Sequence, residues 1–206
     1  MPSSVVAVVA ALGLLGSVPG GVLVATAAPA YSYRGAEVTH RYGSATVTGG
    51  TSKDNIGTAA SFHEPFGCTQ LATKLYVADK LGRAIREIDP ATQQVTTWAG
   101  KLNTPGNDPG AKLFTARFEQ PTGLLWYGLD LLVTDQGLPC VRSVLGSNVI
   151  VYAGECTTLG YTNGVSLASA RFMSPFGIVG EFSESLVYLT EPHRVRRFLS
   201  GTVSSF

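Results

Sequence analysis

An internal repeat constrains the fold of this chain more than any other feature of its sequence. Segments 59–67, 115–123 and 169–177 share an Ala, a Phe two residues on, a Pro three after that and a Gly two further. The repeated aromatic residues lie 56 and 54 residues apart, and they are Phe62, Phe118 and Phe172. Self-similarity at such a period is typical of architectures in which each copy forms one supersecondary unit.

Three further blocks come after each repeated Phe in the same order. The first is a short apolar run that ends in an acid, at 75–79, 131–135 and 187–191. The second contains an Arg that aligns in every copy, as Arg86, Arg142 and Arg196. Its apolar positions, 85/88, 141/144 and 195/198, are three apart and point to opposite faces of a strand, which predicts burial on both sides. The last block is VTTWAG at 95–100, VIVYAG at 149–154 and VSSF at 203–206.

Four short strands per unit, the first opened by Pro-x-Gly, predict an all-β fold of β-propeller blades, each with four antiparallel strands. The blades are expected at about 62–100, 118–154 and 172–206. A partial copy of the last block, ATVTGG at 45–50, predicts one orphan outer strand before them.

The units resemble NHL repeats, and the resemblance covers about residues 45–206. The first unit matches best, through LYVADKLGRAIREIDPATQQVTTWAG at 75–100, whereas the second and third copies differ at several positions. The resemblance implies an interaction scaffold more often than a catalyst, although fold alone does not settle function.

Structural roles are expected for the repeated Phe and Gly residues. The Phe rings should pack between neighbouring blades, where an aromatic side chain buries a large area. Gly67, Gly123 and Gly177 should stand where the inner strands crowd round the axis and a side chain would collide.

The acids that end the second block, Asp79, Asp135 and Glu191, have two interpretations. They could form a ring that binds a divalent cation such as calcium, or a basic ligand. Alternatively, each carboxylate accepts backbone N–H bonds in the following turn or pairs with a repeat Arg such as Arg117 or Arg171. The structural interpretation is favoured, so no cofactor is predicted.

The links before the second and third repeated Phe, at 101–117 and 155–171, are rich in turn residues and lie on one face. We expect this face to contact a ligand, because loops on a rigid scaffold usually carry function. A solvated connector is the competing interpretation. The candidate ligand residues in these links are Asn107, Asp108, Tyr161 and Asn163.

Cys140 and Cys156 are predicted to form a disulfide. Cys140 begins the third strand of the second blade and Cys156 lies just past the end of the fourth, and adjacent antiparallel strands bring those ends together. The third cysteine, Cys68, is expected to be a buried thiol in the inner strand of the first blade.

The remaining polar residues favour a binding role over a catalytic one. The histidines, His40, His63 and His193, occupy unrelated repeat positions, and metal sites need converging ligands. Ser nucleophile elbows, Walker loops and paired Cys-x-x-Cys motifs are absent from the sequence. Lys plus Arg (15) nearly balance Asp plus Glu (14), which argues against nucleic acid as a partner. The alternative function is a propeller-type metal-dependent lyase or hydrolase.

Residues 1–30 are predicted to be a secretory signal peptide. No charged side chain occurs from Val5 to Ala28, and Ala28-Pro29-Ala30 resembles a cleavage site. The protein is then secreted or lumenal, without a membrane association. If cleavage fails, the apolar run at 5–28 is an anchor. Residues 31–44 form an N-terminal segment before the repeats.

Three blades are too few for a closed ring, since propellers typically have at least four and NHL-like ones mostly five or six. Two explanations remain open: a homodimer that completes a six-bladed ring, or a fragment of a longer repeat run without independent function. The orphan strand argues against the dimer, because it would compete with 203–206 for one blade edge. The predicted function is therefore a binding scaffold for a protein or small ligand whose identity the sequence does not reveal.

Overall fold

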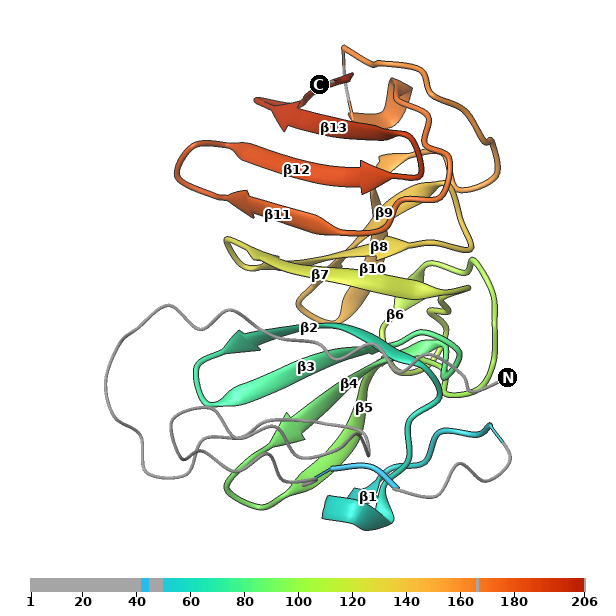
Figure 1. Ribbon diagram of the computed structural model, residues 1–206, viewed down its shortest axis with the longest axis vertical. Helices are drawn as coiled ribbons and strands as arrows, with labels where there is room; N and C mark the ends of the chain where they lie inside the picture. The colour runs from blue at the N-terminus through green and yellow to red at the C-terminus, as the bar shows by residue number, and fades with distance from the viewer. Residues whose placement is uncertain (1–41, 45–49, 166, 206) are drawn as a thin grey trace.

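The computed structural model describes residues 42–44, 50–165 and 167–205 (Figure 1). The predicted signal peptide, most of the 31–44 segment and most of the strand expected at 45–50 lie outside the described residues. Within the described part, no helix is long and apolar enough to cross a membrane.

The described strands form three antiparallel sheets, which we call the first, second and third blades. The first contains β2 (Pro65–Leu71), β3 (Lys74–Asp79), β4 (Ala84–Asp89) and β5 (Gln94–Gly100); the second contains β7 (Pro121–Tyr127), β8 (Asp130–Asp135), β9 (Cys140–Leu145) and β10 (Asn148–Gly154). The third contains β11 (Ile178–Glu181), β12 (Leu186–Glu191), β13 (Arg194–Leu199) and β14 (Thr202–Ser205). Each blade is a meander of neighbouring antiparallel strands, so the predicted all-β blades are confirmed.

The links form an additional outer edge that the sequence pattern did not predict. β1 (Asn55–Ile56) pairs with β5, and β6 (Gly110–Ala111) pairs with β10. In the third blade a single bridge between Gly164 and Val203 takes the same place. Each link therefore runs along the outer edge of the blade that comes after it in the chain. The links also contain short 3-10 helices, η1 (Gly57–Ala59) and η2 (Leu167–Ser169).

Two of the repeated Phe residues, Phe118 and Phe172, pack between neighbouring blades, as predicted. Phe118 and Phe172 are fully buried, and Phe62 is half-buried. The rings of Phe118 and Phe172 lie against Gly100 and Gly154, whose φ angles are +91° and +84°. A Cβ at either glycine would come within 2.8 Å of the ring, so glycine is required both by the left-handed backbone and by the contact.

Tyr42 and Gly43 occupy the corresponding place beside the first blade. Gly43 has a φ of +86° and faces the ring of Phe62, and its N–H donates to the Gly57 carbonyl at 3.2 Å. Tyr42 is buried in the first-blade core. Tyr42-Gly43 thus lies against the first-blade Phe in the way that Ala99-Gly100 lies against the second-blade Phe. The sequence VTHRYG at 38–43 has the same form as VTTWAG at 95–100.

The inner strands approach closely, as the repeated glycines predict. A Cβ on Gly67 would collide with the Thr122 carbonyl oxygen of the second blade, and one on Gly123 would lie 2.5 Å from the Phe176 carbonyl oxygen of the third. The rings of Phe66 and Phe176 meet edge to face with centroids 4.8 Å apart. The first and third blades therefore also touch near the axis.

One burial prediction is wrong in the third blade. Ile85 and Val141 are fully buried in the third strands of the first two blades, but the equivalent Val195 is 39% exposed. The sheet that covers the other two residues belongs to the following blade, and no described residue covers Val195 in the same way. We call this uncovered surface, which includes Val179, Thr190 and Val195, the open side of the third blade.

Candidate functional site

The three repeated acids are interior residues rather than an exposed ring. Asp79 and Asp135 are completely buried, and Glu191 is 6% exposed. Each accepts a backbone N–H from the segment that contains the repeated Phe. The donors are His63 for Asp79 at 2.7 Å, Glu119 and Gln120 for Asp135 at 2.9 and 2.5 Å, and Met173 for Glu191 at 2.5 Å. These bonds correspond to the structural interpretation of the acids.

The arginine partners of the acids differ from those suggested by the sequence. Arg86 pairs with Asp79 at 2.9 Å, and Arg196 pairs with Glu191 at 3.0 Å. Arg117 and Arg171, which the sequence suggested, instead pair with Asp108 and Glu155. The relevant series is therefore the third-strand arginine, which is a diagonal neighbour of the acid: Asp79 pairs in register with Ala84, and Arg86 lies two residues further along the same strand.

Each third-strand arginine is fully buried and connects its own strand to the link of its blade and to the repeated Phe. Arg196 donates to the Arg171 carbonyl at 2.9 Å and the Thr162 carbonyl at 2.8 Å, and its guanidinium lies 5.1 Å from the Phe172 ring centroid. Arg86 and Arg142 make equivalent contacts with their own links and with the rings of Phe62 and Phe118. We call each such set an arginine clamp. The sequence alignment brings out these arginines, but not their role.

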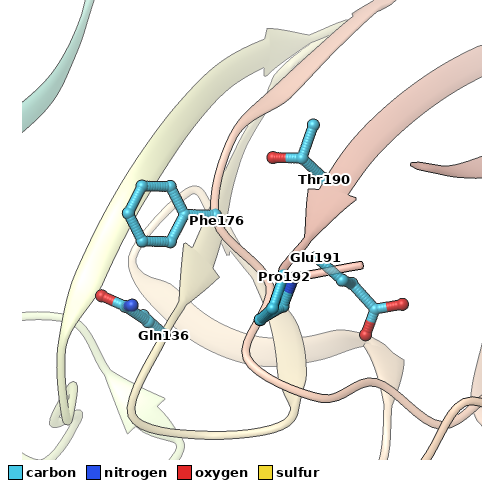
Figure 2. A pocket seen from close by; sticks show the side chains of 5 residues that line it. All are labelled: Gln136, Phe176, Thr190, Glu191 and Pro192. Atoms are coloured by element: carbon cyan, nitrogen blue, oxygen red, sulfur yellow. The ribbon is translucent and has the colours of Figure 1, made fainter. Parts of the chain in front are cut away.

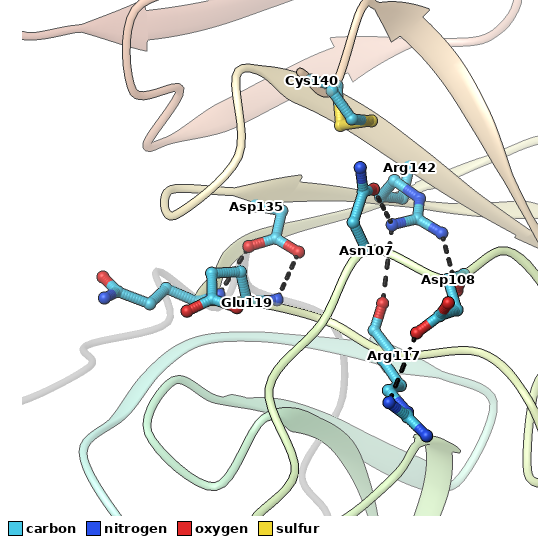
Figure 3. The surroundings of a disulfide bond; sticks show 9 residues. Asn107, Asp108, Arg117, Glu119, Asp135, Cys140 and Arg142 are labelled. Carbon is cyan, nitrogen blue, oxygen red and sulfur yellow. Dashed lines mark hydrogen bonds and ion pairs between the residues drawn. A yellow bond between two sulfur atoms is a disulfide. The ribbon is translucent and has the colours of Figure 1, made fainter.

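The second-blade clamp lacks a direct ion pair (Figure 3). Arg142 donates to Asn107 Oδ1 and to the Asp108 carbonyl, each at 3.3 Å, while Asp135 is held by backbone N–H groups. Burial raises the pKa of Asp135 to about 6, against the opposing effect of its hydrogen bonds. Burial also lowers the pKa of Arg142.

The candidate ligand residues of the links are engaged with the scaffold. Asn107 and Asp108 hold Arg142, and Asn163 Oδ1 accepts from Arg196 at 3.2 Å. The Tyr161 carbonyl accepts from Arg194, whose guanidinium lies 4.4 Å from the Tyr161 ring centroid. The atoms named here therefore position the links against the blades.

The predicted disulfide between Cys140 and Cys156 is confirmed, and it joins the start of β9 to the link after β10. Disulfides persist in oxidising environments, so this bond indicates an extracellular or secretory compartment. Cys68 is half-buried, and burial raises the pKa of its thiol.

A hollow of about 340 Å³ lies between the second and third blades, at the end where the links run (Figure 2). Its lining residues are Gln136, Phe176, Thr190, Glu191 and Pro192. The Oε1 atom of Gln136 is buried without a hydrogen-bond partner among the described residues. Because Glu191 is occupied by Arg196 and Met173, the hollow offers mainly apolar contacts.

The opposite end of the blades carries exposed apolar side chains. In a four-strand meander, the turn between the first two strands and the turn between the last two lie at the same end of the sheet, which we call the hairpin end. The β2–β3, β7–β8 and β11–β12 hairpins extend to the same side in Figure 1. Their large exposed residues are Leu71 (45%), Leu129 (86%) and Phe182 (62%). The third hairpins add Leu145 and Leu199, at 45% and 41%.

This apolar row was missed because exposure cannot be read from residue type. The signal was a large apolar residue at the first hairpin of every copy. Acidic residues Asp130, Glu181 and Glu184 stand among these residues. The Phe182 ring lies against Gly128 in the first hairpin of the second blade, and exposed apolar side chains that gather beside polar residues are typical of interaction sites. No group of three or more His, Cys, Asp or Glu residues that could hold a metal ion occurs among the described residues.

Comparison with known proteins supports the repeat assignment. No protein-family model matches the chain. NHL repeat-containing protein 2 of Bos taurus is 37% identical over 73 residues, which are 34% of this chain and 10% of that protein. The expected resemblance to NHL repeats is therefore confirmed for this stretch, which spans about a tenth of the curated relative.

Solved structures with the same kind of fold come from Bacteroides. An auxiliary nutrient binding protein from Bacteroides ovatus ATCC 8483 superposes with a TM-score of 0.56 at 19% identity, over 76% of this chain and 42% of that one. A second auxiliary nutrient binding protein, from Bacteroides thetaiotaomicron VPI-5482, gives 0.52 at 21% identity, over 65% and 35% of the two chains. A structural genomics protein of unknown function from the same organism gives 0.56 at 19%, over 64% and 32%. At these identities the likeness establishes the propeller-type fold alone.

Proposed function

We propose that this chain, whose repeats are similar to those of NHL-repeat proteins, is a binding module that works in the secretory pathway or outside the cell. The observation that carries the proposal is the hairpin end. One large exposed apolar residue stands at the first hairpin of every blade, with acidic residues nearby. A partner with apolar groups and some positive charge would complement that surface.

The construction of the blades fits this role. The arginine clamps fix each blade internally, and the disulfide adds a covalent link in the second blade. The contacts of Phe118 with Gly100 and of Phe172 with Gly154 fix neighbouring blades to each other, and the hairpins project from this support. Rigid support reduces the conformational entropy that a surface loses on binding. The alternative function, that of a metal-dependent lyase or hydrolase, has no specific observation in its favour among the described residues.

The hairpin end can be tested by paired substitution. Leu129→Ser with Phe182→Ser removes two of the most exposed apolar side chains of this surface. Phe114→Ser with Leu159→Ser is the matched control, because those residues are 83% and 62% exposed in the links. Each chain is immobilised and exposed to the secreted proteins of the source cells, and retained proteins are quantified by mass spectrometry.

A protein retained by the native chain and by the control, but at least tenfold less by the hairpin variant, is the expected result. Equal retention by all three chains would overturn the assignment of the surface. Urea unfolding of each chain shows whether the variants remain folded, since exposed substitutions usually change stability by less than about 0.5 kcal/mol.

The compartment needs a separate measurement. The complete sequence is expressed in secretion-competent cells, and the N-terminus of the product is determined. A protein in the medium that begins at Tyr31 is expected, because cleavage after Ala30 fits the sequence. Retention of an uncleaved, reduced chain inside the cells would contradict the proposed compartment.

A further inference from the structure

The hairpin end of the first blade carries carboxylates that are paired with a lysine of the same blade. Lys74, at the start of β3, has its Nζ 2.6 Å from Glu87 Oε1 and 4.0 Å from Asp89 Oδ2. The exposed apolar residue of this hairpin, Leu71, lies three positions before that lysine. The first blade therefore offers an apolar side chain beside charges that are already paired.

The first hairpins of the second and third blades are acidic and lack such a partner. The segments 127–130 and 181–185, which contain the β7–β8 and β11–β12 turns, include no Lys or Arg. Their acids are Asp130, Glu181 and Glu184. Ser143 Oγ donates to Asp130 at 2.9 Å, and Ser183 Oγ donates to Glu181 at 2.7 Å. None of the three acids forms an ion pair with a described residue, so their negative charges remain uncompensated there.

Apolar side chains join these two hairpins into one surface. The rings of Tyr127 and Phe182 meet edge to face with centroids 5.1 Å apart, and the Phe182 ring also lies against Gly128. Phe182 is nevertheless 62% exposed, and Leu129 is 86% exposed. Residues 127–130 and 181–184 thus combine exposed apolar groups with unpaired carboxylates, and we call them the acidic hairpin patch.

We propose that the acidic hairpin patch binds a segment of a partner protein in which Lys or Arg side chains stand next to large apolar side chains. This inference rests on the proposed binding function and defines the chemistry of the partner. The apolar side chains of the segment would cover Leu129 and Phe182, since buried anchors of this kind carry most of the affinity of an interface. Its cations would lie beside the three acids, where opposite charge selects the partner and accelerates association.

Two other occupants fit the patch less well. Surfaces that bind membranes through exposed apolar residues usually carry Lys and Arg beside them, because many lipid headgroups are anionic. The charged groups beside Leu129 and Phe182 are carboxylates instead. A second copy of the chain that used the same patch would bring like charges together, which is unfavourable.

The proposal is tested with labelled synthetic peptides of equal length. Leu and Arg alternate in the first peptide, Leu and Glu in the second, and Ser and Arg in the third. Binding to the full chain is measured by fluorescence anisotropy. We expect the Leu–Arg peptide to bind roughly tenfold more tightly than either of the others, because only it supplies both apolar anchors and cations. Its affinity should decrease as the salt concentration rises.

Charge-neutralising variants locate the site on the chain. Glu181→Gln with Glu184→Gln should weaken binding of the Leu–Arg peptide roughly tenfold, because both charges beside Phe182 are lost. Glu64→Gln with Glu155→Gln is the matched control, since it changes the net charge equally at link residues whose side chains are 57% and 47% exposed. The control variant should bind the peptide as the native chain does.

The outcomes separate this inference from the proposed function. Equal binding of the Leu–Arg and Leu–Glu peptides would overturn the cationic partner, as would an equal loss of affinity in the two Gln variants or no peptide binding at all. Binding to phosphatidylcholine–phosphatidylserine vesicles that Leu129→Ser with Phe182→Ser abolishes, without peptide binding, would identify a lipid partner instead. In each of these cases the retention of secreted proteins at the hairpin end still decides the proposed function.

Discussion

The second and third blades carry the same repeat, yet only the second has another blade packed against its far side. Val141 is fully buried under that next blade, whereas its equivalent Val195 is 39% exposed. Thr134 holds a carbonyl of its neighbour, whereas Thr190 is exposed. The same residue type at equivalent positions of the two blades is therefore buried in one blade and exposed in the other. The difference shows that a blade of this kind is completed by its neighbour, as expected when repeats contact only adjacent repeats.

The largest difference in stability between the two blades is expected from substitution of their arginine clamps. Arg196→Met leaves Glu191 buried without its ion pair, and we expect a loss of about 3–5 kcal/mol in the free energy of unfolding. Arg142→Met should cost less, because backbone N–H groups already hold Asp135. The control is Arg194→Met at an exposed position, with a loss below about 1 kcal/mol. Urea unfolding measures all three, and equal losses for Arg194 and Arg196 would contradict the clamp.

The disulfide distinguishes the second blade from the third, in which Arg194 stands where the second blade has Cys140. Cys140→Ser with Cys156→Ser opens a loop with a sequence separation of 16 residues, and we expect a loss of about 3 kcal/mol in the chain-entropy model. Thermal unfolding with and without reductant measures the effect. The double variant itself should be insensitive to reductant; a further loss on reduction would indicate another disulfide.

A pH-dependent contribution is expected from the second blade. The pKa of Asp135 is raised to about 6, above the ordinary value of 3.8, so the folded chain binds a proton more tightly than the unfolded chain. The contribution of this group to stability therefore increases as the pH falls from about 7 through 6 toward 4, on the order of 2 kcal/mol. Asp135→Asn removes this dependence. Identical pH profiles of unfolding for the two chains would show that the carboxyl ionises normally.

The smallest effect compares the two valines directly. Val141→Ala removes fully buried methyl groups and should cost about 2 kcal/mol, whereas Val195→Ala should cost about 0.5 kcal/mol. Chemical denaturation provides both values. Equal costs would mean that the open side is covered in solution, and light scattering would then show whether other copies cover it.

The repeat, the strand order and the disulfide could be predicted because each depends on local spacing along the chain. Roles that depend on the path of the links could not. Arg86, Arg142 and Arg196 align in the sequence, but their carbonyl acceptors lie 25 to 34 residues earlier in the chain. The place of Tyr42-Gly43 was also missed, although Gly43, Gly100 and Gly154 precede the repeated Phe by 19, 18 and 18 residues. That spacing is the signal that could have found it.

The contacts of Phe118 and Phe172 with glycines of the preceding blades mean that the blades are completed in order from the N-terminus during synthesis. The ring of Phe118 closes over Gly100, and the ring of Phe172 closes over Gly154, so each blade is sealed by residues translated after it. Because chains are synthesised from the N-terminus at about 5–20 residues per second, the 18 residues between each glycine and its Phe take roughly one to four seconds to translate. A nascent blade is therefore most exposed to chaperones and to aggregation just after its own fourth strand has formed.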